Sequence, residues 1–237
     1  MMKNQQYPSL VDFQDAMVVS LGAVEVIRQP LYDYAIYPTA GLGVLQFFVA
    51  QIGQGISASS GNGTNPKALS DTNMSQPGIL PAPQAYWAQS LEVDFQPGSV
   101  STANTFTIQD PSAHVAVAAA AVQAGANDKM NVLQSGALTF SIGTKPYYQE
   151  GPLYRYPTRP YVRLDTSISS NSATTAEEVK EYVSNTGQVL TFDPGLAIMT
   201  SLNFGVSITW PSVVATPSGF NGRLGVILDG FLFRAVQ

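Results

Sequence analysis

The sequence contains no cysteine and only one histidine, His114, among its 237 residues. Without cysteine there is neither a disulfide framework nor a thiolate metal site, and one imidazole excludes sites built from several histidines. At most one imidazole-based triad remains, and no GxSxG-type elbow accompanies it. We therefore expect His114 to be structural or on the surface, and we expect no catalytic, cofactor-binding or metal site.

Charge is also scarce. Only 11% of the residues are charged, which is less than half of the roughly 25% typical of soluble domains. With 45% hydrophobic residues, the surface must be covered mainly by uncharged polar side chains, glycine and proline. Such a surface suits a protein that is largely covered by neighbours, because desolvating charged side chains is costly. The alternative is a secreted polar β-protein, and we favour assembly.

Two partner classes are disfavoured by what the sequence lacks. The net charge is −5 and the isoelectric point is near 4.7, whereas nucleic-acid binding needs clustered lysine and arginine. We therefore expect no direct sequence-specific nucleic-acid binding. No apolar run approaches the ~18 residues of a membrane span, and the first residues resemble neither a secretory signal nor a transit peptide. No composition break marks a linker, so residues 1–237 are expected to form one unit.

Alternation of apolar and polar residues is the main structural signal. Residues 202–210 (LNFGVSITW) alternate with a period of two, and residues 88–96 do the same, with Glu92 and Asp94 expected on the outward polar face. Ten to fourteen strands separated by proline and glycine turns indicate an all-β fold, a sandwich or jelly roll. Strands are predicted over 18–27, 32–37, 44–52, 88–96, 105–109, 131–143, 162–168, 188–193 and 202–210, with a terminal strand pair over 223–237.

Helical signals are few. Thr175 and Glu178 form a capping box that predicts one short helix near 175–184. Residues 9–17 are compatible with a short amphipathic helix. The alanine-rich run 113–124 is ambiguous, because alanine favours helix whereas its valines favour strand.

Paired carboxylates could serve hydrolytic chemistry, but each pair has a structural explanation. Glu92 and Asp94 lie on the expected polar face of a strand. Glu177 and Glu178 lie in the first turn of the predicted helix, where the dipole favours negative charge. Asp165 and Asp193 are further isolated candidates. We therefore expect the protein not to be an enzyme.

A long polar stretch, residues 53–71, is too rich in glycine, serine and asparagine for a regular element. We expect it to be mobile in a free subunit and to be ordered, at least in part, by neighbouring subunits.

The most distinctive surface feature is a tyrosine-, arginine- and proline-rich segment, residues 146–163, which we call the connector. Tyrosine and arginine are enriched at the centres of protein interfaces, and prolines 146, 152, 157 and 160 stiffen the backbone. We predict an inter-subunit contact, with single-stranded nucleic acid and a role inside the fold as alternatives. The candidate interface residues are Tyr147, Tyr148, Tyr154, Arg155, Tyr156, Arg159 and Tyr161.

Several segments resemble the major capsid proteins of tailless icosahedral viruses and bacteriophages with jelly-roll coats. They are GPLYRYP at 151–157, NFGVSITWP at 203–211, TPSG at 216–219, LGVILDGFLFRAVQ at 224–237, and TNMSQPGILPAP at 72–83 followed by SLEVDF at 90–95. The resemblance implies a non-enzymatic virion protein that self-assembles into a capsid shell as a homo-oligomer. It also implies synthesis in the host cytoplasm and, as partners, copies of itself and other capsid proteins.

The resemblance leaves two architectures open: a single jelly roll with additions, or a compact double jelly roll with a pseudo-division near 125–145. There is no basic N-terminal arm of the kind that small RNA-virus coats use to hold the genome. This departure indicates a shell that lines an internal membrane or relies on other proteins. The competing function is a carbohydrate-binding or adhesion sandwich, for which only Trp87 and Trp210 are available, and Trp210 fits an inward position.

Overall fold

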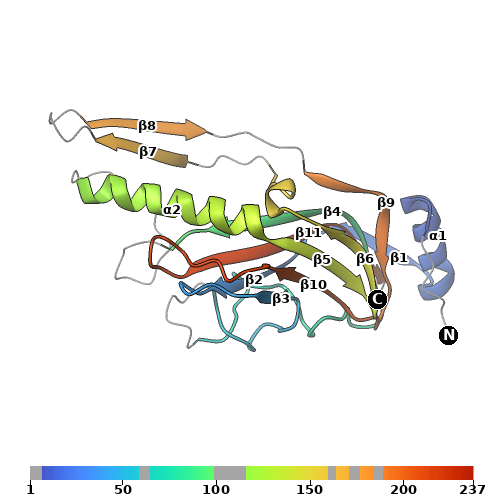
Figure 1. Cartoon of the computed structure of the whole chain (residues 1–237). Coiled ribbons are helices and arrows are strands. Elements are labelled where there is room, and N and C mark those ends of the chain that lie inside the picture. The colour runs from blue at the N-terminus through green and yellow to red at the C-terminus, as the bar shows by residue number, and fades with distance from the viewer. Residues whose placement is uncertain are drawn as a thin grey trace.

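A computed structural model describes residues 7–58, 65–98, 116–159, 164–170, 177–183 and 189–236. Most regular structure in these residues is β-strand, arranged in two larger antiparallel sheets and a separate two-stranded hairpin (Figure 1). The expectation of a mostly β chain is confirmed, and the eleven described strands lie within the expected range.

The strands divide between the two sheets in a mixed sequence order. The first sheet contains β1 (Val24–Arg28), β2 (Leu31–Tyr37), β4 (Gln84–Gln96), β9 (Leu190–Ile198) and β11 (Gly222–Ala235), in the order β1-β11-β4-β9 with β2 also paired to β11. The second contains β3 (Val44–Phe47), β5 (Ala137–Ile142), β6 (Lys145–Glu150) and β10 (Phe204–Thr209), in the order β3-β10-β5-β6.

The antiparallel pairs are nested within one another along the chain. β5 pairs with β6, β4 pairs with β9, β3 pairs with β10, and β2 pairs with β11. Each successive pair encloses the previous one in sequence, so these strands form one long ribbon that is folded over to make two sheets.

The end of the chain differs from its prediction. Residues 223–237 were expected to form a strand pair, but β11 is a single fourteen-residue strand. Its first half pairs with β2 and its second half with β1, while β4 pairs along its other side. Leu224, Val226 and Leu228 lie in the main core, whereas Phe231 and Phe233 lie in a second hydrophobic cluster. Both faces of the strand are therefore largely covered, which explains why its hydrophobic run is continuous rather than alternating.

A close backbone approach fixes a bulge in this strand. The register between β11 and β4 shifts at Asp229 and Gly230. A Cβ atom at Gly230 would lie 1.9 Å from the Trp87 carbonyl oxygen, so only glycine fits there.

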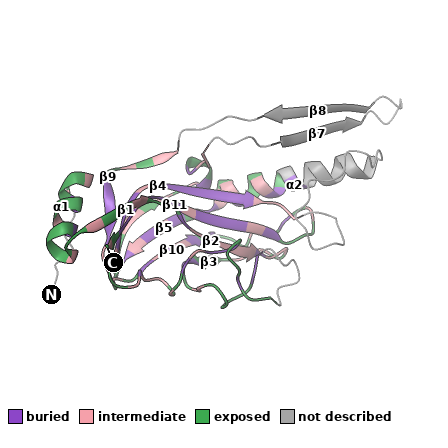
Figure 2. Cartoon of the chain, turned by 180° about the vertical axis from the view of Figure 1, so that it is seen from behind, coloured by how far each residue is buried: buried purple, intermediate pink, exposed green. Residues whose placement is uncertain are grey.

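The main core lies between the two sheets, and Figure 2 shows its strands as largely buried. Phe95 and Val226 reach it from the first sheet, and Phe140 and Ile208 reach it from the second. The predicted alternation is confirmed in β10, where every second residue is buried. Trp210 also points inward, and its indole nitrogen donates to the Val132 carbonyl at 3.0 Å.

Helix α1 (Leu10–Leu21) confirms the amphipathic helix expected over residues 9–17. It continues to Leu21, so the strand predicted over 18–27 is wrong in its first part, and β1 begins only at Val24. Ser9 caps it by accepting a hydrogen bond from the Asp12 amide at 3.2 Å. Phe13 and Met17 pack on Trp87 and Phe233, and this second hydrophobic cluster is separate from the main core. The helix therefore attaches to one end of the first sheet (Figure 1).

The described part of the alanine-rich run, from Ala116 onward, forms helix rather than strand. Helix α2 spans Ala116–Ser135 and leads directly into β5. The strand predicted over 131–143 is therefore wrong in its first part. Val132, in the last turns of the helix, is buried in the main core. Packing therefore stabilises the helical conformation of these residues.

The helix predicted near 175–184 is wrong. Residues Glu177–Val183 form β8, which pairs with β7 (Leu164–Ser170) in a hairpin alongside α2 (Figure 1). The register places Val179 opposite Ile168 and Val183 opposite Leu164. The capping box is a local signal, and it carries no information about a partner strand.

Candidate functional site

The connector leads from the edge of the second sheet to the first sheet. It begins in β6 and continues through a short 3₁₀ helix, η1 (Leu153–Arg155). Leu153 and Tyr156 are fully buried. The Val93 amide of β4 donates to the Tyr156 carbonyl at 2.9 Å. The connector therefore lies beside β4 just beyond Leu190, the residue at which β9 begins.

Two of the candidate tyrosines pack within the chain: Tyr156 is buried, and Tyr148 is half-buried against the main core. The rings of Tyr148 and Tyr156 meet edge to face at 6.0 Å, and Phe192 of β9 packs on Tyr148 at 5.6 Å. The Tyr156 hydroxyl donates to the Glu150 carbonyl at 3.1 Å, and burial raises the pKa of this tyrosine above its usual value. Tyr156 therefore has no free surface for a neighbouring subunit.

The other candidates differ in exposure. Tyr154 is 59% exposed, and Arg155 is also exposed while its guanidinium pairs with Glu150. Tyr147 is half-buried against the core, with the Lys145 ammonium 5.4 Å from its ring centre. Tyr161 lies outside the described residues. Within the described part of the connector, the inter-subunit contact thus depends mainly on Tyr154 and Arg155, and it stays a prediction.

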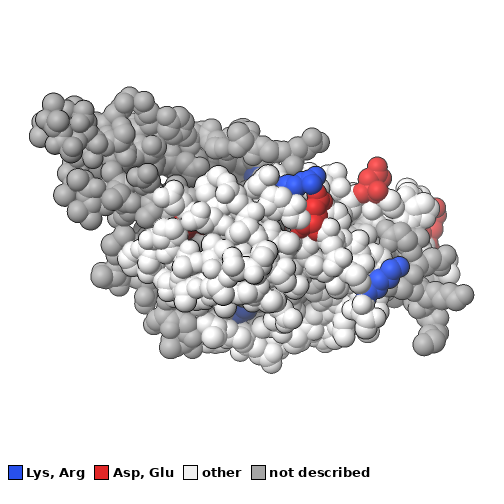
Figure 3. All heavy atoms as spheres, viewed as in Figure 1, with Lys and Arg blue, Asp and Glu red and all other residues white. Residues whose placement is uncertain are grey.

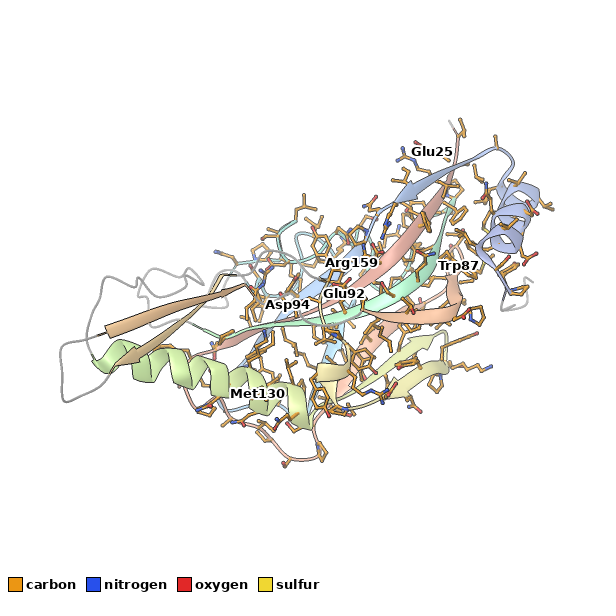
Figure 4. All side chains as sticks on the ribbon, turned by 90° about the horizontal axis from the view of Figure 1, so that it is seen from above. Glu25, Trp87, Glu92, Asp94, Met130 and Arg159 are labelled. Carbon is orange, nitrogen blue, oxygen red and sulfur yellow. The ribbon has the colours of Figure 1, made fainter. Side chains whose placement is uncertain are left out.

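Arg159 fastens the end of the described connector to the first sheet. Its guanidinium lies 3.2 Å from a Glu92 oxygen and also pairs with Asp229, while its backbone amide donates to Glu92 at 2.9 Å. Arg28 approaches Asp229 from β1 at 3.1 Å. Figure 4 shows Glu92 and Arg159 close together beside β4. We call Glu92, Asp229, Arg28 and Arg159 the arginine clasp.

The expectation that Glu92 and Asp94 point to solvent is wrong. Their residues are only 4% and 3% exposed, because this face of β4 is covered as well as the core face. Burial raises the pKa of the Glu92 carboxyl above its usual 4.5, and Arg159 acts to lower it. Sequence reasoning missed the arginine clasp because Glu92 and Arg159 are far apart in the chain. The one signal in the sequence was that Arg159 belongs to the connector, which was expected to make an inter-subunit contact.

A second buried polar cluster lies at the flank where β2 and β3 are edge strands. The Lys67 ammonium lies 2.6 Å from Asp33, whose other oxygen accepts from the Phe48 amide at 2.6 Å. The Ser57 hydroxyl donates to Asp71 at 2.7 Å. These contacts hold residues 48–58 and 65–74 against the sandwich, and we call these two segments the side wall.

The side wall changes the interpretation of the polar stretch 53–71. Backbone bonds join Gly53 to Lys67 at 2.8 Å and Ser57 to Asn65 at 2.8 Å, and the Tyr34 amide of β2 donates to Asp71 at 2.7 Å. The described ends of the stretch are therefore fixed to the fold of a single chain, contrary to the expectation that neighbours order them. Residues 59–64 lie outside the described residues.

The remaining chemical candidates give no cluster. His114 lies outside the described residues, Asp193 lies in β9, Asp165 lies in β7, and the Glu177–Glu178 pair lies in β8. Among the described residues, no three acidic, histidine or cysteine side chains gather to hold a metal ion. Glu92 and Asp229 each bind an arginine, so their arrangement suits fastening rather than proton transfer.

Comparison with protein families, with characterised proteins and with solved structures finds no match to this chain. In the described part of the chain, no helix combines the length and apolar character that crossing a bilayer requires.

Proposed function

We propose that this chain is a structural virion protein that self-assembles into an icosahedral capsid shell. The observation that carries the proposal is the nested pairing of β2 with β11, β3 with β10, β4 with β9 and β5 with β6. Eight strands paired in this way and divided between two sheets are what a jelly roll requires. The jelly roll is a common architecture of viral coats, although the fold alone does not establish function.

The additions favour a single jelly roll over a compact double one. Both larger sheets contribute to one main core. Helices α1 and α2, strand β1 and the β7–β8 hairpin extend the eight-stranded ribbon without forming a second set of paired sheets in the described residues. The segment near 125–145 contains the end of α2 and strand β5, which is an inner strand of the second sheet, so it lies within one sandwich.

The surface supports assembly rather than an isolated monomer. The face seen in Figure 3 is mostly uncharged where it is described, and most of its few charged side chains lie toward the upper and right-hand parts of the view. Large apolar side chains are exposed at several separate places, among them Val44, Leu69 and Val213. A closed shell requires each subunit to contact several neighbours, and scattered apolar contacts on a charge-poor surface meet that requirement.

The carbohydrate-binding alternative receives less support. Sugar recognition on a sandwich commonly uses exposed aromatic rings, but Trp87 and Trp210 are only 3% and 4% exposed. The Trp87 ring packs against Phe13 of α1, and the Trp210 ring packs against Tyr37 of β2. Of the described aromatic side chains, Tyr154 and Phe220 are the most exposed.

Sedimentation velocity of the purified protein tests the proposal. We expect a discrete, very large species that grows at the expense of the monomer as protein concentration rises. A chain that sediments only as a monomer at every concentration and ionic strength contradicts the proposal. A monomer that also binds immobilised oligosaccharides, and loses that binding on Tyr154→Ala, would establish the alternative instead.

A further inference from the structure

The outer surface of the side wall is apolar although its inner surface is ionic. Val49, Ile52, Ile56 and Leu69 are 55%, 43%, 55% and 63% exposed. They lie on two segments that are joined by backbone hydrogen bonds. Exposed aliphatic side chains concentrated on one short region indicate a contact surface rather than chance exposure. Figure 2 shows the corresponding loop below the sandwich with long exposed stretches.

No described charged side chain of the side wall faces solvent. Its ionisable residues are Lys67 and Asp71, which are 6% and 0% exposed. Lys67 pairs with Asp33, and Asp71 binds Ser57 and lies 3.6 Å from Arg223. The exposed polar residues around the aliphatic side chains, such as Gln54, Asn65 and Ser70, are neutral. An apolar centre with a neutral polar rim is the usual anatomy of a protein interface.

The side wall is also anchored firmly. The buried Lys67–Asp33 pair, the Thr72–Asp33 bridge and the bond from the Tyr32 amide to Asn73 at 3.0 Å attach it to β2. A surface already held in one conformation loses little conformational entropy when a partner docks.

We propose that the side wall packs against the side wall of a second copy of this chain. The inference rests on the proposed function and specifies one of the contacts that a shell would use. The chain carries a net charge of −5, so two copies repel each other on average. In a two-fold contact, residues near the axis meet their own copies, so a charge there would face a like charge. The described side wall exposes no charged side chain, so two copies can meet there without this repulsion.

Leu69→Asp and Ile56→Asp test the contact, because each puts a negative charge into the apolar surface of both copies. Both side chains are exposed, so the monomer should keep its melting temperature within a few degrees. Sedimentation velocity should show at least a tenfold loss of assembled material at a concentration where the native chain assembles. Val19→Asp, on the exposed face of α1, is the matched control and should assemble like the native chain.

A labelling experiment tests the geometry without disturbing the charge. The chain has no cysteine, so Leu69→Cys supplies a unique site for pyrene maleimide. Two-fold packing of side walls predicts pyrene excimer emission on assembly, and the Val19→Cys control should give none. A native chain that never assembles contradicts both the shell and this contact. A native chain that assembles, with Leu69→Asp assembling equally well or with no excimer from Leu69→Cys, overturns the side-wall contact alone.

Discussion

At the residue scale, the tyrosines of the connector divide between the core and the surface. Tyr156 is sealed in the core, whereas Tyr154, two residues earlier, projects into solvent. The intervening 3₁₀ turn accounts for the difference, because Leu153 and Tyr156 are three residues apart and share its inner side. Arg159 then holds the chain to β4 through Glu92.

We predict that Tyr156→Ala destabilises the monomer. Removing a fully buried aromatic side chain costs about 3–5 kcal/mol of unfolding free energy, because it leaves a cavity as well as losing apolar burial. Tyr156→Phe removes only the hydroxyl that bonds to Glu150 and should cost about 1 kcal/mol. Urea denaturation measures both values. Tyr154→Ala is the control and should change the free energy by less than about 0.5 kcal/mol. Equal effects at positions 154 and 156 would show that the connector packs differently.

Glu92 gives a prediction about pH. Its folded-state pKa is raised, mainly by burial. A raised carboxyl pKa contributes stability that is fully present below the usual value of 4.5 and is lost as the pH rises through the folded-state value. As the pH rises from 4.5 through the folded-state pKa of Glu92, the unfolding free energy of the native protein should therefore fall relative to that of Glu92→Gln. Urea denaturation at successive pH values measures both.

The control for removing one negative charge is Glu25→Gln. Glu25 forms an exposed pair with Arg234, where solvent screens the interaction. Its effect on stability should be small. If the difference between the native protein and Glu92→Gln stayed constant with pH, or changed in the opposite direction, burial would not control this carboxyl.

At the element scale, the additions to the sandwich are held by different physical means. Helix α1 is attached by an aromatic cluster, in which the Phe13 ring lies 4.9 Å from Phe233 and 5.3 Å from Trp87. The side wall is attached by buried ion pairs and hydrogen bonds. Loss of one attachment should therefore release one element and leave the two sheets intact.

For α1, we predict that Phe13→Ala releases the helix locally. The lost contacts amount to about 3–5 kcal/mol, and an isolated helix of twelve residues is marginal in water. Hydrogen exchange should accelerate in residues 10–21 while the amides of β4 and β11 stay protected. Val19→Ala, at an 89% exposed position of the same helix, should leave exchange nearly unchanged. Acceleration throughout both sheets would mean that α1 is part of the cooperative core.

For the side wall, we predict that Lys67→Met is strongly destabilising. It leaves the Asp33 carboxylate buried without its cation, which costs about 3–5 kcal/mol. Adding Asp33→Asn should recover most of the loss, because the neutral amide oxygen can still accept from the Phe48 amide. The comparison of single and double variants by urea denaturation isolates the pair. A double variant as unstable as Lys67→Met alone would argue against an ionic origin.

At the scale of the whole molecule, local patterns predicted part of the fold. Alternation identified β10 because only one of its faces is buried, and it located β2 and β7 closely, whereas the single strand β11 was predicted as a strand pair. It misjudged β4, whose polar face is also covered, since no local pattern reveals what lies above Glu92. It misassigned β8 because the cross-strand partners of Val179 and Val183 lie in β7.

The candidate site was predicted less completely, for the same reason. Its decisive contacts, Arg159 with Glu92 and Lys67 with Asp33, join residues that are distant in the chain. Composition drew attention to the connector, but composition does not distinguish the exposed Tyr154 from the buried Tyr156. The nested strand pairing emerges only when all eight strands are placed, and it carries the proposal of a capsid shell.

Electron microscopy of the purified, concentrated protein tests that proposal most directly. The account predicts closed particles of uniform diameter whose walls are built from this chain. Leu69→Asp should deplete these particles and Val19→Asp should preserve them. Fields that contain only monomers or irregular aggregates, under conditions where the native chain is folded, would contradict it.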